Sequence, residues 1–246
     1  MDPTSQAFAQ KWPSLAKLEE SETESHDGRE EALLKYILAL DPLPDTPNAV
    51  LTAIDSFSLN HSFLISVGPH KANILRDLIA QQKPKVLLEL GGYLGYSAIL
   101  FAEKMREVHG ASTPKIISLE PSPLFASISQ QLISLAGLES LITIIVGTAS
   151  SSIPNLQLDK QSVDFLFLDH IEDLYIQDFQ IVEQQELFSG NAMVVADNVV
   201  RPGAEEYRNW VRGEEMSGKG WTSRGVRGLI WPGEWEDELE VTTFGG

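Results

Sequence analysis

The stretch from Lys85 to Ser97 reads KVLLELGGYLGYS, and it decides the fold. Its first half, KVLLEL, is an almost continuous apolar run, which is typical of a strand buried on both faces. Its second half is rich in glycine and leads into a helical pattern that continues to Val108. Glycines at such a turn let a ligand approach the backbone, and the following helix N-terminus favours a carboxylate or phosphate. The stretch therefore predicts a strand, a ligand-binding turn and a helix.

Further apolar runs follow this unit and alternate with helical patterns. The runs are KIISLE at 115–120, LITIIV at 141–146, VDFLFLD at 163–169 and AMVVAD at 192–197. The helical patterns cover 97–108, 123–136, 176–188 and 204–212. Such alternation indicates parallel βαβ units. The predicted fold class is α/β, a single doubly wound, Rossmann-like domain whose central, mostly parallel sheet has helices on both faces. The alternating Leu239, Val241 and Thr243 predict a C-terminal antiparallel hairpin.

The N-terminal part has a different composition from this domain. Residues 1–45 are predicted to form a helical, acidic arm and residues 46–246 the ligand-binding domain. The arm contains the polar stretch SETESHDGREE, which predicts a mobile segment or a helical lid, and then REEALLKYILAL, whose helical spacing stops before Pro42. Two amphipathic helices are expected between residues 46 and 82, on either side of a short loop at 64–68.

The charge and composition of the 246-residue chain limit its partners. Its 18 basic and 35 acidic residues give a formal net charge of −17, which repels nucleic acid and anionic membranes and favours a small-molecule substrate. The sequence has no cysteine, so thiolate metal sites and thiol nucleophiles are excluded. The N-terminus lacks a secretory pattern and no apolar run reaches about twenty residues, so a cytoplasmic location without a membrane span is expected. No signal predicts the oligomeric state.

A nucleoside site is predicted where two of the strands end. Glu120 ends the second apolar run, and a carboxylate there can accept hydrogen bonds from both hydroxyls of a ribose. Tyr93 occupies the position of the second glycine of the dinucleotide fingerprint, which disfavours a nicotinamide cofactor. A glycine turn alone can exist for packing, and a strand-end acid is often a solvated charge. Their combination at this spacing favours a nucleoside.

Three oxygen-bearing residues end the next two strands. Asp169 follows one strand, and Asp197 and Asn198 follow the other, so they should meet at the carboxyl edge of the sheet. Two carboxylates and an amide are hard ligands that suit Mg²⁺. The competing interpretation is that Asp197 and Asn198 only form a turn before Pro202.

Successive blocks of the chain resemble the S-adenosylmethionine-dependent catechol O-methyltransferases, from about Asn48 to Arg212. The blocks are AIDSF at 53–57, VLLELGGYLGYSA at 86–98, LEPSP at 119–123, LAGLESLITIIVGTASSSIP at 135–154, FLFLDH at 165–170 and VVADNVVRPGAEE at 194–206. The resemblance implies S-adenosylmethionine and Mg²⁺ as cofactors. It implies cofactor contacts from Val67, Glu89, Gly91, Tyr93, Ser97, Glu120, Ser150, Asp169 and His170, and metal ligands at Asp169, Asp197 and Asn198.

The chain departs from the family pattern where the acceptor would bind. Glu172 stands where the family has a catalytic lysine, so it could be a carboxylate base, an extra metal ligand or a solvated capping acid. Trp231 aligns with the acid that holds the catechol. The substrate pocket is predicted to consist of Phe63, Ile65, Ile171, Pro202 and Trp231.

These departures argue against catechol itself as the acceptor and favour a bulkier, more apolar one. The expected activity is Mg²⁺-assisted O-methylation of a hydroxyl on a small, fairly apolar molecule, such as a phenol or enol of secondary metabolism. The alternative is a protein of this fold that binds the cofactor but has lost methyl transfer, or that performs another reaction such as cyclisation or isomerisation.

Overall fold

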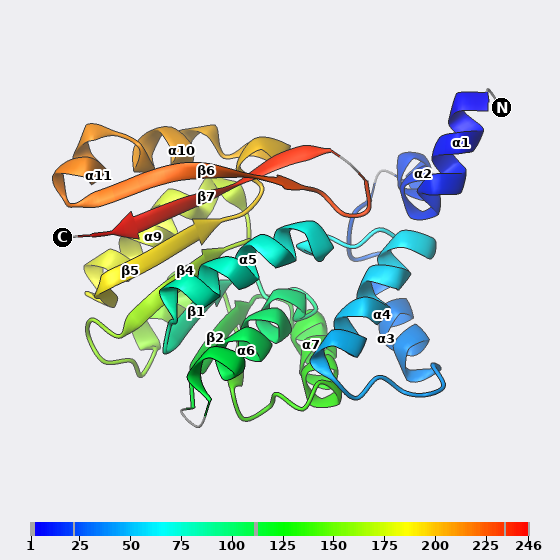
Figure 1. Ribbon diagram of the computed structural model, residues 1–246, viewed down its shortest axis with the longest axis horizontal. Helices are drawn as coiled ribbons and strands as arrows, with labels where there is room; N and C mark the ends of the chain where they lie inside the picture. Colours follow the sequence, from blue (N-terminus) through cyan, green and yellow to red (C-terminus); the bar gives the residue numbers. More distant parts are fainter. Residues whose placement is uncertain (1–2, 22, 111–112, 234, 246) are drawn as a thin grey trace.

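A computed structural model describes residues 3–21, 23–110, 113–233 and 235–245 of the chain. In this part, seven strands form one sheet with the order β3-β2-β1-β4-β5-β7-β6 (Figure 1). The strands are β1 (Val86–Leu90), β2 (Lys115–Glu120), β3 (Ile142–Val146), β4 (Val163–Leu168), β5 (Phe188–Ala196), β6 (Trp221–Leu229) and β7 (Glu236–Phe244).

Helices precede, connect and follow the strands. They are α1 (Pro3–Lys11), α2 (Pro13–Ser21), α3 (Arg29–Leu38), α4 (Pro47–Asn60), α5 (Gly68–Gln82), α6 (Tyr96–His109), α7 (Pro123–Leu135), α8 (Ala149–Ser152), α9 (Tyr175–Gln184), α10 (Glu205–Val211) and α11 (Glu214–Gly218). Short helical turns are η1 (Ile153–Asn155), η2 (Glu172–Leu174) and η3 (Val199–Gly203). None of the helices in the described ranges is long and apolar enough to cross a membrane.

The sheet confirms the predicted doubly wound α/β class. Strands β1 to β5 pair in parallel, and the strand order reverses between β1 and β4. Strand β7 lies antiparallel to both β5 and β6, which confirms the predicted hairpin. In open sheets of this kind, ligands bind where the strand order reverses, beyond the carboxyl ends of the strands.

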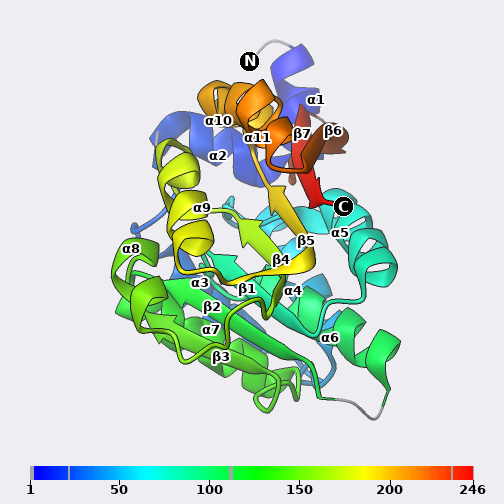
Figure 2. The ribbon, with the colours of Figure 1, turned by 90° about the vertical axis from the view of Figure 1, so that its left-hand side faces the viewer.

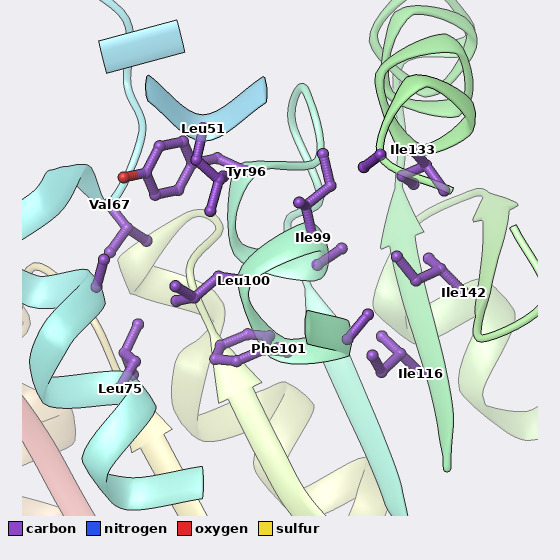
Figure 3. Packing of buried hydrophobic residues seen from close by; sticks show 14 of the residues in the cluster. Leu51, Val67, Leu75, Tyr96, Ile99, Leu100, Phe101, Ile116, Ile133 and Ile142 are labelled. Carbon is purple, nitrogen blue, oxygen red and sulfur yellow. The ribbon is translucent and has the colours of Figure 1, made fainter. Parts of the chain in front are cut away.

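Each face of the sheet has its own apolar core. Leu87 and Phe167 point to the face covered by α5, α6 and α7, whereas Leu88 and Leu168 point to the face covered by α9 and α10. Figure 2 shows these two helical layers on either side of the sheet. Figure 3 shows the first core from close by, with Leu75 of α5 and Phe101 of α6 packed in it. This double burial explains why the strands read as continuous apolar runs.

The prediction of a helix over residues 176–188 is wrong at its C-terminal end. Helix α9 stops at Gln184, and β5 already begins at Phe188, which pairs with Val163 of β4. Glu186 takes a left-handed conformation with φ 56°, and the N–H of Leu187 donates to the carbonyl of Val182. This turn ends the helix four residues earlier than the apolar spacing indicates.

The N-terminal arm folds back on the domain. Leu15 of α2 is buried, and the ring of Trp12 meets that of Trp231 edge to face at a centroid distance of 5.9 Å. Lys17 donates from Nζ to the carbonyl of His61 at 3.0 Å. Figure 1 shows α2 near the loop between β6 and β7, which carries Trp231.

Candidate active site

A cavity of about 630 Å³ opens at the carboxyl ends of the parallel strands. Residues at or just beyond these ends line it, including Gly91 after β1, Glu120 of β2, Asp169 after β4 and Asp197 after β5. The strand-order reversal therefore brings together side chains that the sequence analysis placed at one edge.

The cavity contains nearly all the residues predicted to form the site. The predicted residues that line it are Phe63, Ile65, Val67, Gly91, Tyr93, Ser97, Glu120, Asp169, His170, Ile171, Glu172, Asp197, Asn198, Pro202 and Trp231. Glu89 is fully buried and is not among the lining residues, and Ser150 is exposed on α8 outside the lining. Their functional roles stay predictions.

The glycine-rich turn is packed too tightly for larger residues. Gly91 has φ +96°, and an added Cβ would lie 2.1 Å from the carbonyl oxygen of Asp169. The turn also positions Glu120, whose carboxylate accepts hydrogen bonds from the backbone N–H groups of Tyr93 and Ser122, both at 2.7 Å. Burial raises the pKa of Glu120, while these bonds oppose the shift. The carboxylate is thus held in place at the cavity wall.

Glu89 is a buried carboxyl next to this turn. It accepts a hydrogen bond from the hydroxyl of Ser118, and its Oε1 has no hydrogen-bond partner among the residues that the structure describes. Burial raises its pKa to about 7, because a charged carboxylate loses its hydration there. An unpartnered buried oxygen is costly unless a ligand supplies a donor.

The predicted metal ligands Asp169, Asp197 and Asn198 form one corner of the cavity, called here the metal corner. A buried ion-pair cluster that was not predicted from the sequence lies there. Nζ of Lys71 lies 2.5 Å from Oδ1 of Asp197 and 2.6 Å from Oδ2 of Asp237. All three side chains are at most 2% exposed. Burial alone would lower the pKa of Lys71, but the two carboxylates outweigh it and raise the pKa. The lysine therefore stays charged and compensates two buried acids.

The remaining oxygens of this corner suit a divalent cation. The side chain of Asp169 accepts no hydrogen bond from the described residues, and burial together with the neighbouring charge of Asp197 raises its pKa well above the ordinary value. Asn198 donates from Nδ2 to the carbonyl of Arg201 at 2.8 Å, which leaves its Oδ1 as a potential ligand. Among the described residues, no cluster of three or more His, Asp or Glu side chains could hold a metal. A cation bound at this corner would be held by the carboxylates of Asp169 and Asp197 and the amide oxygen of Asn198, a donor set that fits Mg²⁺.

His170 and Glu172 follow Asp169 along one wall. His170 pairs through Nε2 with Oδ2 of the buried Asp178 at 2.8 Å, and its buried Nδ1 has no hydrogen-bond partner in the described part of the chain. The aspartate fixes the orientation of the ring. Glu172 lies in η2, where burial raises the pKa of its carboxyl.

The mouth of the cavity is apolar. Ile65 is 43% exposed and Ile171 is 64% exposed, which is unusual for large aliphatic side chains. Trp231 is held between Gly68, whose added Cβ would lie 2.2 Å from its Cβ, and the carbonyl of Asp55, which accepts from its Nε1 at 3.2 Å. Trp235 adds a second indole to the lining. The acceptor end is therefore built to contact apolar surface.

Several lining residues were absent from the predicted site. Lys71 could have been found, because it lies on the apolar face of α5, at helical spacing from Leu75 and Leu78. Asp237, which pairs with Lys71 but does not line the cavity, could also have been found, since it continues the inward alternation of Leu239 and Val241. The predicted mobile segment or helical lid came with no contact residues, so the places of Leu18, Glu24, Ser25 and His26 in the lining were missed.

Comparisons with known proteins agree with this geometry. A family model described as O-methyltransferase matches residues 49–209. Catechol O-methyltransferase of Bos taurus is 35% identical over 187 residues, a match that covers 75% of this chain and 66% of that protein. The enzyme of the same name from Mus musculus is 33% identical over 187 residues, covering 75% of this chain and 68% of that protein. The chain thus spans about two thirds of the length of these relatives.

A solved structure shows the same fold. The O-methyltransferase from Bacillus cereus, in complex with SAH, matches with a TM-score of 0.65 at 22% identity, over 87% of this chain and 97% of that chain. The family match extends over most of the strands that build the cavity, from β1 to β5. The chain therefore belongs to the O-methyltransferase family, as a catechol O-methyltransferase-like member.

Proposed function

We propose that the protein is an S-adenosylmethionine-dependent, Mg²⁺-assisted O-methyltransferase that acts on a hydroxyl of a small, fairly apolar molecule. One observation carries the proposal: the glycine-rich turn and the oxygens of Asp169, Asp197 and Asn198 line the same cavity. A methyl donor and an activated hydroxyl held in this cavity would be in reach of each other, which is the main requirement for a bimolecular displacement.

The cofactor would lie along the turn between β1 and α6. Glu120 is placed to accept hydrogen bonds from the hydroxyls of a ribose, and Gly91 lines the cavity beside it without a side chain. Glu89, whose Oε1 has no hydrogen-bond partner among the described residues, would accept a hydrogen bond from the cationic amino group of the cofactor. S-adenosylmethionine supplies an electrophilic methyl group on a sulfonium centre. The chain's own contribution is to bind and orient this donor.

The acceptor hydroxyl would lie at the metal corner. Asp169, Asp197 and Asn198 would hold Mg²⁺, which when bound lowers the pKa of a coordinated hydroxyl. Lys71 fixes Asp197 from the buried side, so this carboxylate keeps one orientation. Ile65, Ile171 and Trp231 would exclude water from the reacting atoms and contact the apolar part of the acceptor.

Glu172 is the proposed proton acceptor. It lines the cavity on the chain segment that follows Asp169, and its raised pKa makes it a better base than a solvated carboxylate. The proton of the acceptor hydroxyl would move to its carboxylate as the oxygen forms a bond to the methyl carbon. The bond from that carbon to the sulfonium sulfur would break in the same displacement, and its electron pair would remain on the sulfur of S-adenosylhomocysteine. A glutamate here would replace the lysine of the resembled family.

Calorimetry tests the two halves of the site separately. We expect S-adenosylhomocysteine to bind with or without Mg²⁺, and esculetin, a flat bicyclic catechol, to bind the cofactor-loaded protein only when Mg²⁺ is present. Esculetin binding that is unaffected by chelation of the metal would count against the metal assignment. Absence of S-adenosylhomocysteine binding would overturn the proposed function as a whole.

Substitution of Glu172 tests its role as the base. Glu172→Gln keeps the size of the side chain but cannot accept a proton, so kcat should fall about a hundredfold with little change in KM. The neighbouring Asp173→Asn is the matched control, because that residue does not line the cavity. If the two variants were equally active, Glu172 would be a solvated side chain and not the catalytic base.

A further inference from the structure

The N-terminal arm contributes side chains to the cavity at two separate places. Leu18 of α2 and the segment Glu24 to His26 line the same cavity as the glycine-rich turn and the metal corner. These residues precede the matched family region, which begins at residue 49. The wall that they form therefore lies outside the region matched by the family model.

The segment that carries His26 is anchored by two buried side chains. Arg29 is 7% exposed and donates to the carbonyls of Phe63, at 2.8 Å, and Thr23. Glu30 is fully buried, and its Oε1 accepts from the backbone N–H of His26 at 3.0 Å and from the hydroxyl of Tyr93 at 3.1 Å. The arm is thus bonded to both ends of the site, through Phe63 at the acceptor wall and Tyr93 at the cofactor turn.

His26 lies at the cofactor end. Its ring stacks on Phe125 with a centroid distance of 4.4 Å, and Phe125 meets Tyr93 edge to face at 5.0 Å. The backbone N–H of the same Tyr93 holds Glu120, the residue proposed for the ribose. His26 therefore lies next to the place of the ribose, with a flat ring that faces Phe125.

Leu18 lies at the acceptor end. Helix α2 is fixed by the buried Leu15 and by the contact of the preceding Trp12 with Trp231. An added Cβ at Gly233, in the loop after β6, would lie 3.5 Å from Cδ1 of Leu15, so the arm packs directly on that loop. Leu18 thus joins an apolar wall whose other members include Ile65 and Trp231.

We propose that the N-terminal arm is a substrate-binding element, in which His26 contacts the ribose side of the cofactor and Leu18 contacts the apolar part of the acceptor. This inference rests on the proposed function. It assigns acceptor selectivity in part to a segment outside the matched family region. It also implies that His26 contacts the cofactor but not the acceptor, and that Leu18 contacts the acceptor but not the cofactor.

Two point variants of the full-length protein test the inference. His26→Ala should weaken S-adenosylhomocysteine binding about five- to tenfold, as measured by calorimetry, and leave the KM for esculetin unchanged. Leu18→Ala should raise the KM for esculetin by about the same factor and leave S-adenosylhomocysteine binding unchanged. The matched controls are His70→Ala and Leu38→Ala, which truncate exposed residues that do not line the cavity.

The pattern of effects separates the possible results. The proposal is supported if His26→Ala weakens only the binding of S-adenosylhomocysteine and Leu18→Ala raises only the KM for esculetin. Both control variants should leave both values unchanged. Unchanged affinities for both variants, or equal losses for both ligands together with a lowered melting temperature, would overturn it. Wild-type protein that binds no S-adenosylhomocysteine would instead overturn the proposed function, so the two failures are distinct.

Discussion

Lys71 shows how one buried charge organises the site. Without it, Asp197 and Asp237 would be two uncompensated carboxylates in the interior, next to the half-buried Asp169. Burying a charge is expensive unless it is paired and hydrogen-bonded, and here each carboxylate has the ammonium as a partner. The lysine therefore stabilises the fold and the metal corner through the same contacts.

Replacement of Lys71 should destabilise the protein strongly. Lys71→Met removes the cation and leaves buried carboxylates without compensation, so the free energy of unfolding should fall by about 3 to 5 kcal/mol. Urea denaturation at neutral pH measures this change. Lys35→Met, at an exposed position of α3, is the control and should be nearly neutral. A Lys71→Met protein as stable as the control would contradict the role of the cluster.

The buried Glu89 should make stability depend on pH. Its pKa is about 7 in the fold against 4.5 for an ordinary glutamate, so the folded state binds its proton more tightly than the unfolded state. Its contribution is complete below the unfolded pKa and is lost as pH rises through the folded pKa. Unfolding of the ligand-free protein should show that wild type loses up to about 3 kcal/mol relative to Glu89→Gln between about pH 5 and pH 8. Parallel pH profiles would show that Glu89 does not titrate in this range.

At the scale of elements, the glycine-rich turn between β1 and α6 packs closely against β2. An added Cβ at Gly92 would lie 2.4 Å from the hydroxyl oxygen of Ser118 on β2, and Gly92 has no positive φ. The conflict is therefore steric rather than conformational. It should be relieved when the opposing hydroxyl is removed.

A double-variant experiment tests this packing. Gly92→Ala alone should cost about 1 to 3 kcal/mol of stability, and Ser118→Ala in the same chain should restore part of the loss. Thermal unfolding of the two single variants and the double variant gives the coupling energy. Strictly additive effects would mean that the turn and β2 do not constrain each other.

Much of the element scale could be predicted, because its signals are local. Apolar runs marked β1 to β5, and the strand ends placed Asp169 and Asp197 at one edge, where the structure has them. The start of β5 was missed, since helical spacing continued past the left-handed Glu186. Contacts between distant segments could not be read from any local pattern, as with Lys71 and Asp237, which are 166 residues apart.

At the scale of the whole molecule, the described residues combine a two-faced core with a large cavity at the carboxyl edge of the sheet. The cofactor would bind the folded chain at the carboxyl ends of β1 and β2 and the loops beyond them. A ligand that binds only the folded state stabilises it by mass action. The size of the stabilisation by the ligand therefore shows whether the cofactor site is formed in the folded protein.

S-adenosylhomocysteine should therefore raise the melting temperature. At about a hundred times its dissociation constant, the expected shift is about 5 to 10 °C for a domain of this size. Differential scanning fluorimetry measures it, and Glu120→Ala at the same ligand concentration should show a much smaller shift. A wild-type melting temperature that does not respond to the ligand would exclude this cofactor site.

The central claim is that this cavity transfers a methyl group to a hydroxyl. The most direct measurement is incubation of the protein with S-adenosylmethionine that carries a deuterated methyl group, Mg²⁺ and esculetin, followed by mass spectrometry. We predict esculetin with one deuterated O-methyl group and an equal amount of S-adenosylhomocysteine, both lost in Asn198→Ala and after chelation of the metal. Cofactor and esculetin that both bind but remain unmethylated would contradict the claim.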